Sequence, residues 1–276
     1  MGVSRIDTKM GRMYHNGRGL DKAYYSVTTI LNKINPKGFG FDNWLKNYGH
    51  YSETIVRAKA GLGTIVHDIL DMMKADPSFV LDWDFVEDFI KQNLSHVSIE
   101  YYKGIGACVE RVMKYVESYI VWADDYSPTF LGTEVMLYHK DYDWAGCCDD
   151  PLQFANGSVM ISDIKTGTKN DSHLLQGVAY ATLWDAIFPK AYKATSVGIL
   201  YINADYHTKP TYSFTTVELD SIKGRRLRKE WMQMMELFRA RYANADGSYT
   251  IKPWYKPKTQ LKLNSVDHNF LNNKTE

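Results

Sequence analysis

Cysteine is scarce in this sequence: Cys108 and the adjacent pair Cys147 and Cys148 are the three cysteines among 276 residues. Neighbouring cysteines rarely pair with each other, because a disulfide requires a specific geometry. No apolar run approaches the roughly 20 residues of a membrane-spanning helix. Charges are scattered through residues 1–25, where a signal peptide needs an apolar stretch. We therefore expect a reduced, cytoplasmic protein that has no membrane partner.

A strong net charge is also missing. The formal charge is only +1, so any contact with a polyanion must come from local patches rather than from an overall field. No linker rich in proline, glycine or serine divides the chain, and 45% of its residues are hydrophobic, which is ordinary for a globular protein with a substantial core. We therefore predict a single domain over residues 1–276.

Hydrophobic periodicity divides this domain into three parts: a mainly helical part over 1–125, a sheet core over 126–205, and a strand, basic helix and tail over 206–276. The predicted fold class is α/β, with a mixed central β-sheet flanked by helices. Helices are predicted over most of 41–71, with interruptions at Gly61 and Gly63, and over 79–93, 99–123 and 172–188. Strands are predicted over 130–139, 144–154, 157–165, 194–202 and 211–218. Residues 24–31 fit either a strand or a short helix capped by Ser26 or Thr28.

The most informative segment is Asp163-Ile164-Lys165, at the end of a predicted strand. Side chains alternate along a strand, so Asp163 and Lys165 emerge on the same face and place a carboxylate beside an ammonium. Asp149 lies on the preceding predicted strand, and a hairpin would bring its carboxylate near Asp163. Two carboxylates from adjacent strands suit Mg²⁺ or Mn²⁺. Asp150 competes with Asp149, because a one-residue register shift exchanges their faces.

A D-x-K pair alone is also typical of solvated charges on a surface strand, so the neighbouring helices matter. Gln176 and Tyr180 lie one turn apart on the same face of a predicted helix. His67 shares a face with Gly63 and Asp71 on an earlier predicted helix, away from its apolar stripe. Taken singly, His67 would fit a hydrogen-bonded helix residue and Tyr180 a core residue.

Together these residues form a pattern of short motifs. The sequence contains, in order, Gly63-Thr64-Ile65-Val66-His67, Gly146-Cys147-Cys148-Asp149, Asp163-Ile164-Lys165-Thr166 and Gln176-Gly177-Val178-Ala179-Tyr180. These motifs resemble the RecB-like branch of the PD-(D/E)XK nuclease superfamily, whose signature runs G-x-x-x-H, G-x-x-D, D-x-K-T and Q-x-x-x-Y. The run 25–31, with Trp44 and Gly49, is also similar to phage exonucleases and the related mitochondrial genome-maintenance exonucleases, although Tyr25 stands where that family favours proline. The resemblance implies a restriction-endonuclease-like core with an N-terminal helical elaboration.

The resemblance also implies a role for each motif residue. His67, Asp149, Asp163 and the backbone carbonyl of Ile164 would bind one or two Mg²⁺ or Mn²⁺ ions, and Lys165 would orient or help to deprotonate the attacking water and steady phosphate charge. Gln176 and Tyr180 would position Lys165 or contact the DNA backbone. Glu134, on the previous predicted strand, is a further candidate ligand or an exposed strand glutamate.

The implied function is a metal-dependent DNA exonuclease of replication, recombination or repair, in phage or phage-like systems, that leaves a 5′-phosphate. A structure-specific endonuclease for flaps or branched DNA, or a DNA-binding protein of the same fold that does not cleave, are the alternatives. Some family members hold an iron-sulfur cluster through cysteines that include a C-terminal group; this chain has none after Cys148, so we predict no cluster. No helicase P-loop is present, so a helicase or single-strand-binding partner would be a separate chain.

Basic and aromatic residues outside the motifs are candidates for contact with DNA that has a free end, in single-stranded or double-stranded form. Basic side chains would follow phosphates, and tryptophan or tyrosine would stack on unpaired bases. Charged helix faces are, however, also typical of plain solvent exposure. The candidates are Arg57, Lys59, Lys223, Arg225, Arg226, Arg228, Lys229 and Trp254.

Overall fold

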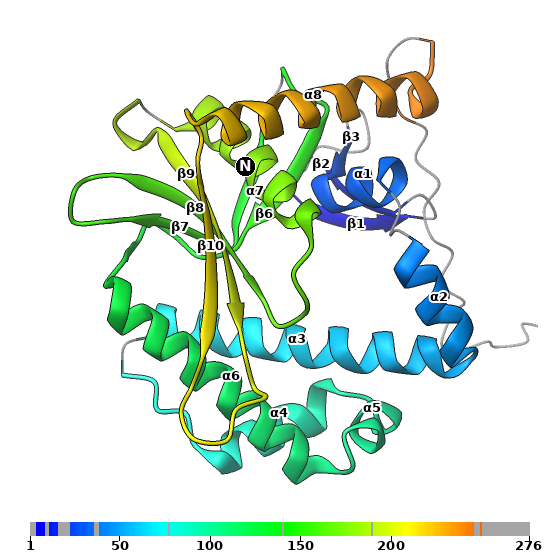
Figure 1. The fold of residues 1–276 in the computed structure, drawn as a ribbon, viewed down its shortest axis with the longest axis vertical. Coiled ribbons are helices and arrows are strands. Elements are labelled where there is room, and N and C mark those ends of the chain that lie inside the picture. The colour runs from blue at the N-terminus through cyan, green and yellow to red at the C-terminus, as the bar shows by residue number, and fades with distance from the viewer. Residues whose placement is uncertain are drawn as a thin grey trace, which may run out of the picture.

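The computed structural model describes residues 4–8, 11–15, 23–35, 39–76, 78–139, 141–188, 190–245 and 249. Its class is α/β, with mixed sheets flanked by helices, as predicted (Figure 1). The helices are α1 (Val27–Ile34), α2 (Phe39–Tyr48), α3 (Tyr51–Ala75), α4 (Trp83–Asn93), α5 (His96–Tyr101), α6 (Ile105–Tyr126), α7 (Asp171–Ile187) and α8 (Ile222–Tyr242), with a 3-10 turn, η1 (Lys190–Tyr192). No helix in this described part is long and apolar enough to cross a membrane.

The strands form two five-stranded sheets rather than one. The first sheet has the order β1-β2-β3-β6-β5 and the second the order β10-β9-β8-β7-β4. The strands are β1 (Ser4–Thr8), β2 (Gly11–His15), β3 (Ala23–Ser26), β4 (Thr129–Phe130), β5 (Val135–Tyr138), β6 (Trp144–Cys148), β7 (Asp150–Gln153), β8 (Val159–Lys165), β9 (Ala194–Ile202) and β10 (Tyr212–Glu218). Each sheet is mixed, because β3 runs parallel to β6 and β8 parallel to β9. A parallel pair needs a crossover connection, and α7 supplies it between β8 and β9.

Two hydrophobic cores cover opposite faces of the second sheet. The first joins α1, α7 and α8 to strands of both sheets and contains Trp144 and Trp231, whereas the second places α3, α4 and α6 against the other face. Along β8, Ile161 belongs to the first core and Ile164 to the second. Because side chains alternate along a strand, Asp163 shares the face of Ile161 and points towards α7.

Residues 24–31, which fit either a strand or a helix, contain both. Strand β3 ends at Ser26, and α1 begins immediately after it. The Ser26 hydroxyl accepts the backbone N–H of Thr29 at 3.0 Å and so caps the helix. Strands β1 and β2, which the sequence analysis did not identify, extend this sheet by pairing with β3, so the part predicted as mainly helical also contributes three strands.

Several predicted helix boundaries were wrong. Gly61 and Gly63 do not interrupt α3; the chain turns instead at Gly49, where φ is +51°. A Cβ at position 61 would lie 2.7 Å from a Leu94 methyl group, so close packing accounts for this glycine. The helix predicted over 99–123 is divided into α5 and α6, because Lys103 and Gly104 adopt φ values of +67° and +116°.

Two predicted strands, 130–139 and 144–154, are each divided between the two sheets. The first becomes β4 and β5, and the second becomes β6 and β7. Glu134 lies at one break with φ +48°, and its N–H donates to the carbonyl of Asp149, at the other break, at 3.0 Å. Asp149 is therefore the residue at which the chain passes from the first sheet to the second.

Candidate active site

The end of β8 brings a carboxylate and an ammonium together in the interior. Asp163 is almost fully buried and forms an ion pair with Lys165, whose side chain is 23% exposed. Burial raises the pKa of Asp163 to about 6, against the opposing effect of Lys165. Burial also disfavours the charge on Lys165, but the adjacent Asp163 and Asp149 outweigh it and raise the pKa of Lys165. Each side chain thus favours the charged form of the other.

Asp149 connects this strand to α3. Its Oδ2 accepts the backbone N–H of Ile164 at 3.1 Å and lies 3.6 Å from Nδ1 of His67. Both side chains remain partly exposed, at 18% for Asp149 and 26% for His67. Because the chain passes from the first sheet to the second at Asp149, the carboxylate of this residue lies between α3, which carries His67, and β8, which carries Asp163 and Lys165.

Asp150, the alternative to Asp149, points elsewhere. Its side chain is fully buried, and its Oδ1 lies 2.5 Å from Nζ of Lys74, which also lies 2.7 Å from Asp71. Burial raises the pKa of Asp150, although Lys74 opposes the shift. The change of sheet separates the two neighbours, so Asp149, and not Asp150, lines a cavity with Asp163 and His67.

Gln176 and Tyr180, which lie one turn apart on α7, form a hydrogen-bond chain to Asp163 and not to Lys165. The side-chain amide of Gln176 donates to Oδ1 of Asp163 at 3.2 Å and to the hydroxyl of Tyr180 at 3.1 Å. Gln176 is 8% exposed and Tyr180 is 4% exposed. This hydrogen-bond chain fixes the orientation of the buried carboxylate, while Lys165 extends past it towards the cavity.

The motif glycines are explained by close contact. A Cβ on Gly146 would lie 2.3 Å from the ring of Tyr180, so only glycine lets β6 lie flat against that ring. A Cβ on Gly63 would lie 2.9 Å from Oγ1 of Thr166, at the point where α3 approaches the end of β8. Each glycine therefore brings one pair of motif-bearing elements together.

Two cavities open onto these residues, with volumes of about 360 Å³ and about 850 Å³. His67, Glu134 and Lys165 line both. The smaller is lined in addition by Asp149, Asp163, Gln176 and Tyr180. The site residues predicted from the four motifs therefore meet at one place.

Arg5 and Arg12 also line both cavities and were not predicted. They come from β1 and β2, the strands missed in the sequence. The available signal was the short apolar pair Met13 and Tyr14, which follows Arg12 and is buried in β2. Two arginines add positive charge beside the carboxylates.

The donor types suit a hard divalent cation, although they do not surround a common centre. Within the described residues, no group of three or more histidine, cysteine, aspartate and glutamate side chains is placed to hold a metal ion. Oδ2 of Asp163 is buried and, apart from its ion pair with Lys165, has no hydrogen-bond partner in the described part of the chain. This oxygen, whose partner among the described residues is Lys165, lines a cavity with Asp149 and His67 and is a donor of the type that Mg²⁺ or Mn²⁺ takes.

The predicted DNA-contacting residues are not gathered in one place. Lys59 lines the 850 Å³ cavity, whereas Arg57 is exposed and pairs with Glu53 at 2.7 Å. The basic residues of α8 line neither cavity, and α8 lies across the molecule from α3 (Figure 1). Arg228, in that helix, lies 3.7 Å from Asp185. Trp254 is outside the described residues.

No protein-family model and no curated protein matches this sequence. Among solved structures, the chain is similar to a crystal structure named "Putative exonuclease" from Eubacterium rectale, with 11% identity and a TM-score of 0.34, over 62% of this chain and 70% of that one. The structure of SSO0001 matches with 16% identity and a TM-score of 0.25, over 54% of this chain and 70% of that one. Structural similarities this distant do not establish the function of this chain.

Proposed function

We propose that this chain is a metal-dependent nuclease that hydrolyses phosphodiester bonds at DNA ends. The observation that carries the proposal is the meeting of Asp163, Lys165, Asp149 and His67 at one cavity, although they come from separate elements. Buried charges are costly unless they are paired or functional. An accessible lysine beside two carboxylates has the chemistry needed to bind both a cation and a phosphate.

We infer a role for each of these residues from its chemistry and from its place beside the cavity. Asp149, Asp163, His67 and the Ile164 carbonyl would hold Mg²⁺ or Mn²⁺, which when bound supplies a water of lowered pKa and neutralises phosphate charge. Lys165 would donate hydrogen bonds to the phosphate and orient the attacking water. Gln176 would keep Asp163 in place through its amide. Attack of water on phosphorus breaks the bond to the 3′ oxygen and leaves a 5′-phosphate.

A cleavage assay with end-labelled DNA tests this proposal. Linear single-stranded and double-stranded DNA would be incubated with the protein in Mg²⁺, Mn²⁺ or EDTA, beside a circular single strand of the same sequence. We expect degradation of a linear substrate in either metal, none in EDTA, and a resistant circle. A cut circle would replace the exonuclease with an endonuclease.

The same assay includes the outcome that overturns the proposal. If the purified protein binds DNA but leaves every linear and branched substrate intact in Mn²⁺, the chain is a binding protein and not a nuclease. An Asp163→Asn variant prepared in parallel separates its activity from that of a contaminating nuclease, because a contaminant would survive the substitution.

A further inference from the structure

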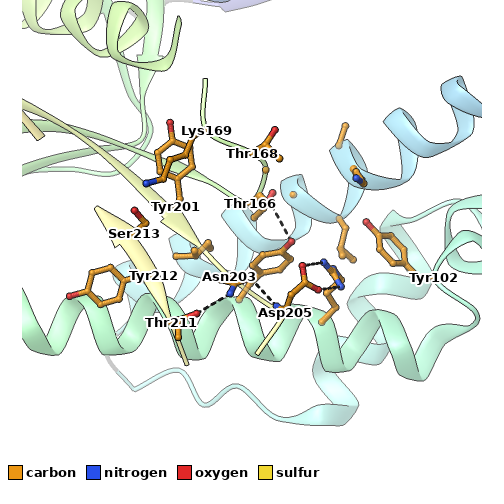
Figure 2. Close-up of a pocket in the computed structure, with 18 of the residues that line it drawn as sticks. Tyr102, Thr166, Thr168, Lys169, Tyr201, Asn203, Asp205, Thr211, Tyr212 and Ser213 are labelled. Atoms are coloured by element: carbon orange, nitrogen blue, oxygen red, sulfur yellow. Dashed lines mark hydrogen bonds and ion pairs between the residues drawn. The ribbon is translucent and has the colours of Figure 1, made fainter. Parts of the chain in front are cut away.

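A third cavity, of about 1030 Å³, continues from the candidate active site along the end of β8 (Figure 2). It shares Lys59, Gly63 and the segment Thr166 to Thr168 with the 850 Å³ cavity that contains His67 and Lys165. The other walls come from the α5–α6 turn, from α6 and from β9 and β10. We call this cavity the tyrosine trough. A polymer that reaches Lys165 from this side would pass through it.

The trough is positively charged although the chain is nearly neutral. Lys59, Lys103 and Lys169 line it and are exposed, and none of them forms an ion pair with another described residue. Asp205 also lines the trough, but Arg111 neutralises it at 2.9 Å. The remaining charge is therefore that of three lysines, which suits a chain of phosphates.

Tyrosines line opposite sides of the trough; Tyr102 and Tyr212 are partly exposed, whereas Tyr201 is buried. Tyr102 lies on one side, and Tyr201 and Tyr212 lie on the other (Figure 2). Nζ of Lys169 lies 5.6 Å from the centre of the Tyr201 ring, and the Arg111 guanidinium lies 6.0 Å from that of Tyr102. Such pairs of aromatic and cationic groups are typical of surfaces that stack bases and hold phosphates.

The local fold presents these groups towards the cavity. Tyr102 ends α5, and the left-handed backbone of Lys103 and Gly104 turns the chain sharply into α6. The Tyr115 hydroxyl donates to the carbonyl of Thr166 at 3.1 Å, which ties α6 to the end of β8. The trough is therefore joined rigidly to the strand that carries Asp163 and Lys165.

We propose that the tyrosine trough binds the single-stranded part of a DNA substrate, with a base stacked on Tyr102 and phosphates held by Lys103 and Lys169. A base can stack on a protein ring only when its face is free, which requires an unpaired strand. This inference deepens the proposed nuclease function, and it rests on that function for the cleavage of the bound strand. Binding in the trough can nevertheless be measured without cleavage.

Fluorescence anisotropy with a labelled single-stranded oligothymidine in EDTA tests the trough. We expect Tyr102→Ala to weaken binding by about 5- to 160-fold, the range for loss of one stacked base, and Tyr102→Phe to bind like the wild type. Lys103→Gln and Lys169→Gln should each weaken binding and lower the slope of log affinity against log salt by about 0.7. Affinity for a blunt duplex should change much less in Tyr102→Ala.

Matched controls come from residues outside the trough. Tyr51→Ala removes an exposed ring at the first residue of α3, outside the trough, and Lys190→Gln removes an exposed charge in η1; neither should change single-strand affinity. If Tyr102→Ala does not fold, as judged by its melting temperature, the two exposed lysine variants still decide the result.

The outcomes separate the two proposals. Tight single-strand binding that depends on Tyr102 and Lys103, without cleavage in Mn²⁺, would support the trough and refute the nuclease. Cleavage that persists while all trough variants bind normally would refute the trough alone. A wild-type protein that does not bind the single strand, or variants that weaken duplex binding equally, would also overturn the trough.

Discussion

Two buried lysine–aspartate pairs lie close together in this structure and differ in what surrounds them. Lys165 and Asp163 line two cavities, and the lysine is 23% exposed. Lys74 and Asp150 are enclosed, with side chains that are 6% and 0% exposed. The same chemical pair thus occurs once where a substrate can reach it and once where it cannot.

The enclosed pair joins the elements that carry the accessible one. Lys74 lies on α3, on the face that also carries His67 and Asp71, and Asp150 follows Asp149 directly. Thr133 donates to Asp71 at 2.5 Å and extends the network to the loop before β5. We therefore propose that Lys165 and Asp163 take part in the chemistry, whereas Lys74 and Asp150 hold α3 against β7.

The largest expected effect concerns the accessible pair. Lys165→Ala or Asp163→Asn should lower the rate of DNA cleavage by about 10³- to 10⁴-fold, because each removes a group that acts on the water, the metal or the phosphate. Single-strand affinity in EDTA should change little. Lys165→Ala leaves the buried Asp163 carboxylate unpaired and should also lower the melting temperature, so cleavage rates are compared at equal folded fraction. Retained cleavage in either variant would remove these residues from the site.

The enclosed pair should respond in stability instead. Lys74→Met leaves Asp150 and Asp71 without their cation, which should lower the free energy of unfolding by about 3–5 kcal/mol, measured by urea denaturation. The double variant Lys74→Met with Asp150→Leu should recover much of this loss, because it leaves no unpaired charge at Asp150. A single variant that keeps its stability but loses cleavage would erase the distinction between the pairs.

Metal binding should also distinguish the pairs. At a Mn²⁺ concentration of about 100 times Kd, the wild type should gain about 2.7 kcal/mol of stability, seen as a rise in melting temperature that EDTA reverses. Asp163→Asn should lose most of this gain, whereas the Lys74→Met and Asp150→Leu double variant should keep it. Equal stabilisation of Asp163→Asn would place the metal elsewhere.

Much of the second sheet, and the grouping of the motif residues at one place, could be predicted from the sequence. Strand alternation placed Asp163 and Lys165 on one face, and helical spacing placed Gln176 beside Tyr180; the structure confirms both arrangements. These predictions succeeded because each depends on a local period that the backbone imposes. The metal and the catalytic roles remain predictions.

The break between Asp149 and Asp150 could not be predicted in the same way. The residues on both sides of it are buried, so the sequence shows one continuous strand although the halves pair with different sheets. Gly63 was similarly misread as an interruption, because its approach to Thr166 involves an element distant in sequence. Contacts between elements distant in sequence therefore determine both the strand break after Asp149 and the need for glycine at position 63.

The smallest expected effects come from the uncharged side chains that donate a hydrogen bond to a carboxylate beside each lysine. Gln176 donates to Asp163, and Thr133 donates to Asp71 beside Lys74. Gln176→Met should lower cleavage by about 5- to 10-fold, the equivalent of about 1 kcal/mol for one hydrogen bond. Thr133→Val, of similar shape, should cost about 1 kcal/mol of stability and leave the cleavage rate of the folded protein unchanged. If Thr133→Val slowed cleavage as much as Gln176→Met at equal folded fraction, the enclosed network would act on the reaction and not only on the position of α3.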